Sequence, residues 1–259
     1  MKHSFLLKSL LALAILTTSY LPDAYAAFSF GTNSSGVQDV TMNASDVGQS
    51  FTANWLCSAN TTCGSSGTTP KTLSATGTFT LDSYTSSGIT LSATIKNTTS
   101  SSVQAALMSI GISAPGLKSD MITAGSVFTQ IGLPNDPNGN IPGGFKSINA
   151  CIYSENGCNG TNILYGLGDG YTGGTMNPIS TDSFKFILAS NSASIGSSVT
   201  LSDFAVKFQT GLGPNGSSYE FGDGLGPSPT PEPGSFWLLG SALLAMIGFS
   251  LRKTMPKKA

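Results

Sequence analysis

Four cysteines are the residues whose type and spacing most directly suggest chemistry: Cys57, Cys63, Cys151 and Cys158. They allow three different pairings. The short separations favour two local disulfides, Cys57–Cys63 and Cys151–Cys158, each contributing roughly 2–2.5 kcal/mol and holding loops more than the whole fold. A four-thiolate zinc site is the alternative, but the close ligand spacing of such sites is missing. No C-x-x-C motif supports redox catalysis. We therefore expect no metal and no cofactor.

Histidine and glutamate restrict the possible catalysis further. The single histidine, His3, lies at the extreme N-terminus, so residues 27–259 contain none. This excludes Ser-His-Asp and Cys-His catalysis and histidine-bound metals from that part of the chain. A glycosidase would need two carboxylates, and Glu155 and Glu220 are the only glutamates between residues 27 and 226. We expect both to be solvated loop carboxylates, and we predict no catalytic residues.

Two binding functions stay open as alternatives. Trp55, Tyr153, Tyr165 and Tyr171 offer aromatic faces to a sugar, although core positions are the simpler explanation for them. Asp136, Asn138 and Asn140 alternate as calcium ligands do, but Ile141 and Ser147 replace the Gly and Glu of an EF-hand loop. A calcium site of another, less regular kind at Asp136 or Asp169 stays open as an alternative.

The elements that would position these residues are predicted to be β-strands, because apolar residues alternate with polar ones. Each expected strand buries one face, and Tyr84–Gly88 is expected to be a hairpin turn between the first two. These faces are Ala75, Gly77, Phe79 and Leu81; Ile89, Leu91, Ala93 and Ile95; Ala106, Met108, Ile110 and Ile112; Phe184, Phe186 and Leu188; and Phe204, Val206 and Phe208. The pattern predicts an all-β domain over residues 27–226, an antiparallel β-sandwich or jelly-roll-like fold.

The charge composition of this domain argues against nucleic-acid binding. Between residues 27 and 230 there are six lysines, eleven acidic residues and no arginine, a net charge of −5. Nucleic-acid binders need a basic stripe, so we expect no nucleic acid as a partner. The abundance of Gly, Ser, Thr and Asn is typical of disorder, which we expect for residues 64–70 and for the segment after Gly211.

The first 26 residues have the pattern of a secretory signal peptide. Lys2 and Lys8 are followed by the apolar run Leu10–Leu16 and by Ala24-Tyr25-Ala26. Cleavage is expected between Ala26 and Ala27. Export to an oxidising compartment is also the condition under which paired cysteines form disulfides.

The last residues, 227–259, have a three-part order. Four prolines at alternate positions from Pro227 to Pro233 precede the apolar run Phe236–Leu251, which is followed by basic residues. The run is long enough for a transmembrane helix once flanking residues reach the interfaces. The basic end should stay cytoplasmic, which leaves the domain outside.

Pro231-Glu232-Pro233, the apolar run and Arg252-Lys253 together resemble the PEP-CTERM sorting signal. Thr230 and the Arg-Lys pair depart from the usual Val and Arg-Arg. The resemblance implies an exosortase-like membrane protease as a partner and a helix that anchors the protein in the inner membrane only until processing. A plain tail anchor behind a proline linker is the alternative.

A second resemblance concerns the domain. Asn149–Gly160, followed by a Gly-rich segment and Phe184–Leu188, resembles the cistern subgroup of PEP-CTERM proteins, and Ile95–Thr98 and Phe204–Gln209 are similar to strand ends of that subgroup. No enzymatic activity is implied. We therefore predict a non-enzymatic, exported protein of the cell surface or extracellular matrix, with exopolysaccharide of a biofilm as its second partner. A carbohydrate-binding module and a carboxylate-based glycosidase are the alternatives.

Overall fold

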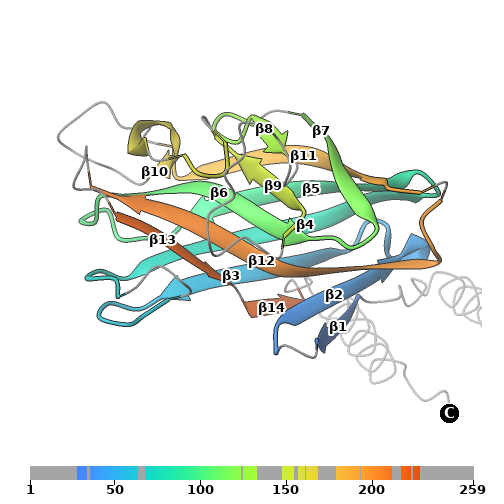
Figure 1. The fold of residues 1–259 in the computed structure, drawn as a ribbon, viewed down its shortest axis with the longest axis horizontal. Coiled ribbons are helices and arrows are strands. Elements are labelled where there is room, and N and C mark those ends of the chain that lie inside the picture. Colours follow the sequence, from blue (N-terminus) through green and yellow to red (C-terminus); the bar gives the residue numbers. More distant parts are fainter. Residues whose placement is uncertain are drawn as a thin grey trace, which may run out of the picture. The chain divides into compact units, whose positions relative to one another are not determined.

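The computed structural model describes residues 28–33, 36–63, 68–123, 125–132, 148–154, 157–160, 162–168, 179–192, 194–211, 217–222 and 224–227. In this part of the chain, two β-sheets share one hydrophobic core (Figure 1). Sheet A has the order β1-β2-β12-β6-β9-β8, with β10 also paired to β6 and β13 to β12; sheet B has the order β14-β3-β4-β5-β11-β7. The long strands run in similar directions, as in an aligned sandwich (Figure 1). The predicted all-β, antiparallel class is confirmed.

The strands and short 3₁₀ helices have the following bounds: β1 Ser29–Thr32, β2 Gln38–Asn43, η1 Ala44–Asp46, β3 Ser50–Cys57, β4 Leu73–Thr85, β5 Gly88–Asn97, β6 Ala105–Ser113, β7 Leu117–Thr123, β8 Gln130–Gly132, β9 Ala150–Tyr153, η3 Ile163–Tyr165, β10 Leu167–Gly168, β11 Thr181–Ser190, β12 Ser198–Thr210, β13 Ser217–Gly222 and β14 Gly224–Pro227. Strands β4 and β5 form the predicted hairpin, with Thr85 opposite Gly88. Phe79 and Leu91 are fully buried on the faces that the alternation predicts.

An aromatic cluster joins the two sheets. Phe51 of β3 stacks on Phe79 of β4 at a centroid distance of 5.2 Å. Phe204 of β12, in the opposite sheet, lies 5.4 Å from Phe51 and 5.3 Å from Phe79. Phe28 adds an edge contact to Phe51 at 5.4 Å. Because these rings come from both sheets, the inner faces of the sandwich pack directly against each other.

One predicted strand face is wrong. The pairing of β6 with β12 skips Met108, which produces a register irregularity. An extra residue reverses the direction of the side chains on either side of it. Ile110 and Ile112 therefore point into the main core, whereas Ala106 and Met108 pack with Ile163 in a separate small cluster.

Part of the predicted disorder is also wrong. Residues 217–222 and 224–227 form β13 and β14, which pair with β12 and β3 respectively. Thr68 forms an isolated bridge with Thr62. Composition gave the wrong prediction here because a polar segment can form a strand when the open edge of an existing sheet offers its backbone hydrogen-bond partners. Residues 64–67, 212–216 and 228–259 lie outside the described part of the chain.

Candidate functional site

A row of four side chains crosses the outer face of sheet A. The register places Tyr153 of β9 opposite Ser109 of β6, Ser109 opposite Lys207 of β12, and Lys207 opposite Glu220 of β13. Directly opposed residues project from the same face. The next residue of β12, Phe208, points into the main core, so this row faces away from it. All four side chains are nonetheless more than nine-tenths buried.

The segment after β9 covers this row. Cys151 and Cys158 form a disulfide with a Cα–Cα distance of 6.2 Å, which turns the chain back over the sheet. The Ser109 hydroxyl donates a hydrogen bond of 3.0 Å to the Cys158 carbonyl. The following residue, Asn159, accepts a hydrogen bond of 3.0 Å at Oδ1 from Nζ of Lys207. Contacts from two neighbouring strands therefore place residues 158 and 159 above the lysine.

The surroundings of Lys207 are apolar on one side and polar on the other. Ile148, Cys151, Tyr153, Cys158 and Ala205 form a buried cluster on this face. Burial lowers the pKa of the Lys207 amine to about 8, and the negative charge of Glu220 opposes this shift. A buried amine with a pKa near 8 is present in its neutral, nucleophilic form at mildly alkaline pH.

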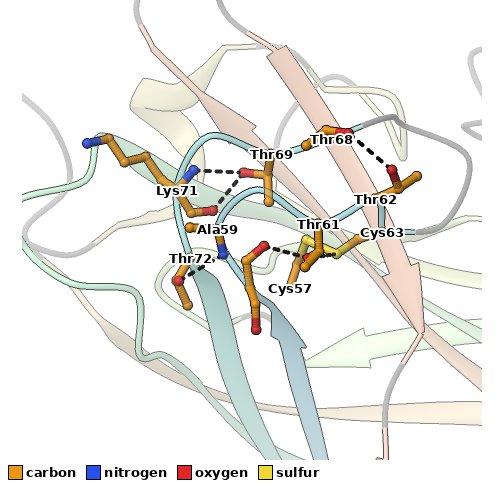
Figure 2. Close-up of a disulfide and its surroundings, with 10 residues drawn as sticks. Cys57, Ala59, Thr61, Thr62, Cys63, Thr68, Thr69, Lys71 and Thr72 are labelled. Atoms are coloured by element: carbon orange, nitrogen blue, oxygen red, sulfur yellow. Dashed lines mark hydrogen bonds between the residues drawn. A yellow bond between two sulfur atoms is a disulfide. The ribbon is translucent and has the colours of Figure 1, made fainter.

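The other disulfide, Cys57–Cys63, closes a loop at the end of β3 with a Cα–Cα distance of 5.8 Å (Figure 2). Three further contacts hold the loop: Thr61 Oγ1 to the Ser58 carbonyl at 2.6 Å, the Ala59 N–H to Thr72 Oγ1 at 3.1 Å, and the Thr62 and Thr68 hydroxyls to each other at 3.1 Å. Both predicted local pairings are thus present. Each ties a loop to the strand that precedes it.

Two of the four aromatic residues considered for sugar binding lie in the interior. Trp55 is 1% exposed, and its Nε1–H donates to the Phe204 carbonyl at 2.9 Å. Tyr153 is 7% exposed, in the row described above. The sugar-binding interpretation is wrong for these two residues because packed neighbours cover their ring faces. Tyr165 is 43% exposed, and Tyr171 lies outside the described residues.

The prediction for Glu220 is wrong as well. This residue is in strand β13 and is buried next to Lys207, not solvated in a loop. Its position depends on the pairing of β13 with β12, which composition did not predict. Glu155, Asp136 and Asp169 lie outside the described residues. Among the residues that are described, no three His, Cys, Asp or Glu side chains gather in a way that could hold a metal ion.

The predicted processing signals lie outside the described residues. These are the cleavage residues Ala26 and Ala27, the sorting residues Pro231-Glu232-Pro233 and Arg252-Lys253, and the apolar run Phe236–Leu251. Within the described part of the chain, no helix has the length and hydropathy needed to cross a membrane.

Lys207 is the residue of this candidate site that sequence reasoning missed. Strict alternation with Val206 and Phe208 places it on the outer face of its strand, where a lysine is normally solvated. Its burial results from the covering segment, which is distant in sequence. The local sequence carried no signal of this burial, because Lys207 and Gln209 alternate with Val206 and Phe208 as polar residues do on a solvent-facing strand.

Residues 229–253 match the family model for the PEP-CTERM protein-sorting motif. The matched segment contains every residue predicted for the sorting signal, so the resemblance to PEP-CTERM proteins is confirmed. The cistern subgroup stays a prediction. No curated protein and no solved structure matches the chain.

Proposed function

Because the PEP-CTERM motif indicates an exported protein that is processed by an exosortase, we propose that this chain is a non-enzymatic component of the cell surface or extracellular matrix. An exosortase-like membrane protease removes residues beyond the Pro231-Glu232-Pro233 site, and the β-sandwich then associates with exopolysaccharide. The observation that carries this proposal is the motif at residues 229–253, directly behind the domain. The N-terminal signal pattern supports the same direction of transport.

The physical basis of the processing step lies in the composition of the tail. The prolines between Pro227 and Pro233 remove backbone donors and favour an extended chain. The apolar run Phe236–Leu251, with its basic flank on the cytoplasmic side, would hold that extended segment at the non-cytoplasmic face of the inner membrane. A membrane protease would find its recognition site in an accessible conformation there.

The chemistry of the outer face of sheet B is an argument for the proposed association with a hydrated polymer. It carries rows of hydroxyl side chains, here called the hydroxyl face: Thr52, Thr76, Thr78, Thr80, Ser92, Thr94, Thr181 and Ser183. The register aligns Thr78 with Thr94, and Thr94 with Ser183, whose hydroxyl lies 3.0 Å from that of Thr94. Hydroxyls that both donate and accept hydrogen bonds match the chemistry of a polysaccharide.

Processing is tested by mass spectrometry of surface material from cells with and without the membrane protease. In normal cells, peptides beyond Pro233 should be depleted relative to peptides from the sandwich, and Glu232→Ala should restore them. Equal levels in normal cells would identify a permanent tail anchor and overturn the sorting proposal.

Matrix association is tested separately, by cosedimentation of the protein with exopolysaccharide from its own cells. Thr78→Val together with Thr94→Val removes two hydroxyls from the hydroxyl face while keeping shape and β propensity. We expect a several-fold loss of bound protein. Thr200→Val, an exposed threonine of β12 in sheet A, is the matched control. Absence of binding by the unaltered protein would contradict the matrix role without affecting the processing step.

A further inference from the structure

Three groups with complementary chemistry meet on the outer face of sheet A. The Lys207 amine is fully buried and donates to Oδ1 of Asn159 at 3.0 Å. Because Oδ1 is bonded to Cγ, this hydrogen bond keeps the amine within one bond length of contact with the side-chain amide group. The Glu220 carboxyl group, directly opposite Lys207 on β13, is also buried. A nucleophile, an acyl group and a proton carrier are therefore assembled in one place.

We propose that Lys207 and Asn159 react to form an intramolecular amide bond, between Nζ of the lysine and Cγ of the asparagine, with release of ammonia. Glu220 carries the protons. The bond would join β12 covalently to the segment that the Cys151–Cys158 disulfide already ties to β9.

The reaction balances without any oxidant, metal or cofactor. The Lys207 ammonium transfers one proton to the Glu220 carboxylate, which leaves a neutral amine and a neutral acid. The amine attacks Cγ of Asn159 to give a tetrahedral intermediate. The acid then protonates the departing amide nitrogen as the C–N bond breaks. The second proton lost by the lysine nitrogen leaves with the ammonia as ammonium, and Glu220 returns to its carboxylate form.

The site favours each part of this step. Burial disfavours the charged amine and thus favours the nucleophilic form. Fixed neighbours hold amine and amide in contact, which converts an otherwise slow bimolecular amidation into an intramolecular one. The Ser109 bond to the Cys158 carbonyl fixes the backbone beside Asn159. Asn159 itself is exposed, which gives the released ammonia a path to solvent.

Lys185, a lysine at the surface of sheet B, makes a useful comparison. Lys185 forms a salt bridge of 2.7 Å with Asp82, and its side chain is 49% exposed. Because water reaches both side chains, this pair has the character of an ordinary surface ion pair. What distinguishes Lys207 is the combination of full burial, an amide at hydrogen-bond distance and an adjacent buried carboxyl group.

The test is tryptic mapping of the full chain, expressed with its export signals and reduced before digestion. Without the bond, trypsin cleaves after Lys146, Lys185 and Lys207 and yields separate peptides 147–185 and 186–207. With the bond, Lys207 resists cleavage. We expect a branched species in which residues 147–185 are joined to a peptide that starts at residue 186 and continues past 207, lighter than the sum of the two by one ammonia.

Fragmentation must locate the link, because ammonia loss alone is ambiguous. Asn159 precedes Gly160, and an Asn-Gly pair also loses ammonia when it cyclises to a succinimide. A succinimide leaves Lys207 free, so trypsin would still cleave there. Ammonia loss with normal cleavage after Lys207, or unlinked peptides alone, would overturn the proposal.

Variants then assign the roles. Asn159→Ala, at an exposed position that should not disturb folding, and Lys207→Met should each abolish the branched peptide. Glu220→Gln should slow its formation about a hundredfold, the usual contribution of a positioned proton carrier. Asn54→Ala, an exposed asparagine of β3, should leave the link unchanged. An unchanged rate in Glu220→Gln would overturn the role of the carboxyl group. All these readouts are independent of tail processing.

Discussion

The indole N–H of Trp55 donates a hydrogen bond of 2.9 Å to the backbone carbonyl of Phe204, and this bond connects the two sheets through the core. The carbonyl is available because β12 is irregular at this point. Ser202 pairs with Ser113 and Ala205 with Gly111, so two residues of β12 lie opposite one residue of β6. Asp203 adopts a positive φ of 49° at this bulge. The tryptophan thus supplies the donor that the neighbouring strand does not.

Replacing Trp55 by Phe should destabilise the domain by roughly 2–4 kcal/mol, because a buried carbonyl loses its donor and the core loses volume. Chemical denaturation of the purified domain measures the change. Leu56→Ala is the control: Leu56 is adjacent in sequence but 65% exposed, and the expected change is within about 0.5 kcal/mol. Equal effects of the two substitutions would show that the hydrogen bond contributes little.

The same indole ring leaves no space for a side chain at Gly77. A Cβ at this position would lie 2.8 Å from Cη2 of Trp55 and 2.9 Å from Cε2 of Phe79, both in the packed core. Gly77→Ala should therefore cost about 1–3 kcal/mol through overpacking. In a Trp55→Phe background the cost should fall, which a double-mutant cycle measures directly. Gly222→Ala has no neighbour within 4 Å of the added carbon and should be nearly neutral.

The two disulfides should differ in their effect on the proposed cross-link. Cys151→Ser with Cys158→Ser releases the segment that carries Asn159, so formation of the branched peptide should slow markedly. Cys57→Ser with Cys63→Ser alters a loop at the end of β3 and should leave the rate unchanged. Both double variants should lose roughly 2 kcal/mol of stability, as short closed loops do. Similar rates in the two variants would mean that the Ser109 contact alone positions Asn159.

Lys207 should make stability depend on alkaline pH when the cross-link cannot form. Its pKa is lowered from 10.5 to about 8 in the folded protein. Between these values the unfolded chain binds more protons, so the free energy of unfolding rises with pH over this window. In the Asn159→Ala variant, where burial still lowers the pKa, we expect a rise on the order of 2–3 kcal/mol.

The reference for that measurement is Asn159→Ala combined with Lys207→Met, which differs from the first variant only in the lysine. Tyr153 of β9 and Glu220 of β13, which share the row with Lys207, are present in both variants. The difference between the two variants isolates the lysine. A flat difference between pH about 8 and 10.5 would show that the amine has an ordinary pKa in the folded protein, and would weaken the nucleophile assignment.

Local patterns predicted much of this protein correctly. Alternation placed Phe79, Leu91 and Phe186 on buried faces because side-chain direction in a strand depends only on position along it. The two disulfides join cysteines six and seven residues apart, so their pairing needs little more than a turn. The sorting motif at residues 229–253 is linear and is recognised as such.

Tertiary structure alone decided the rest. The bulge at Met108 depends on how β6 meets β12, and it reversed the direction of half a strand. Lys207 is 48 residues from Asn159, and Glu220 reaches the pair only because β13 adds to the edge of β12. An outward-facing lysine is solvated or buried depending on which other segment of the chain packs over it. That covering is a contact between distant segments, which the period of a single strand does not encode.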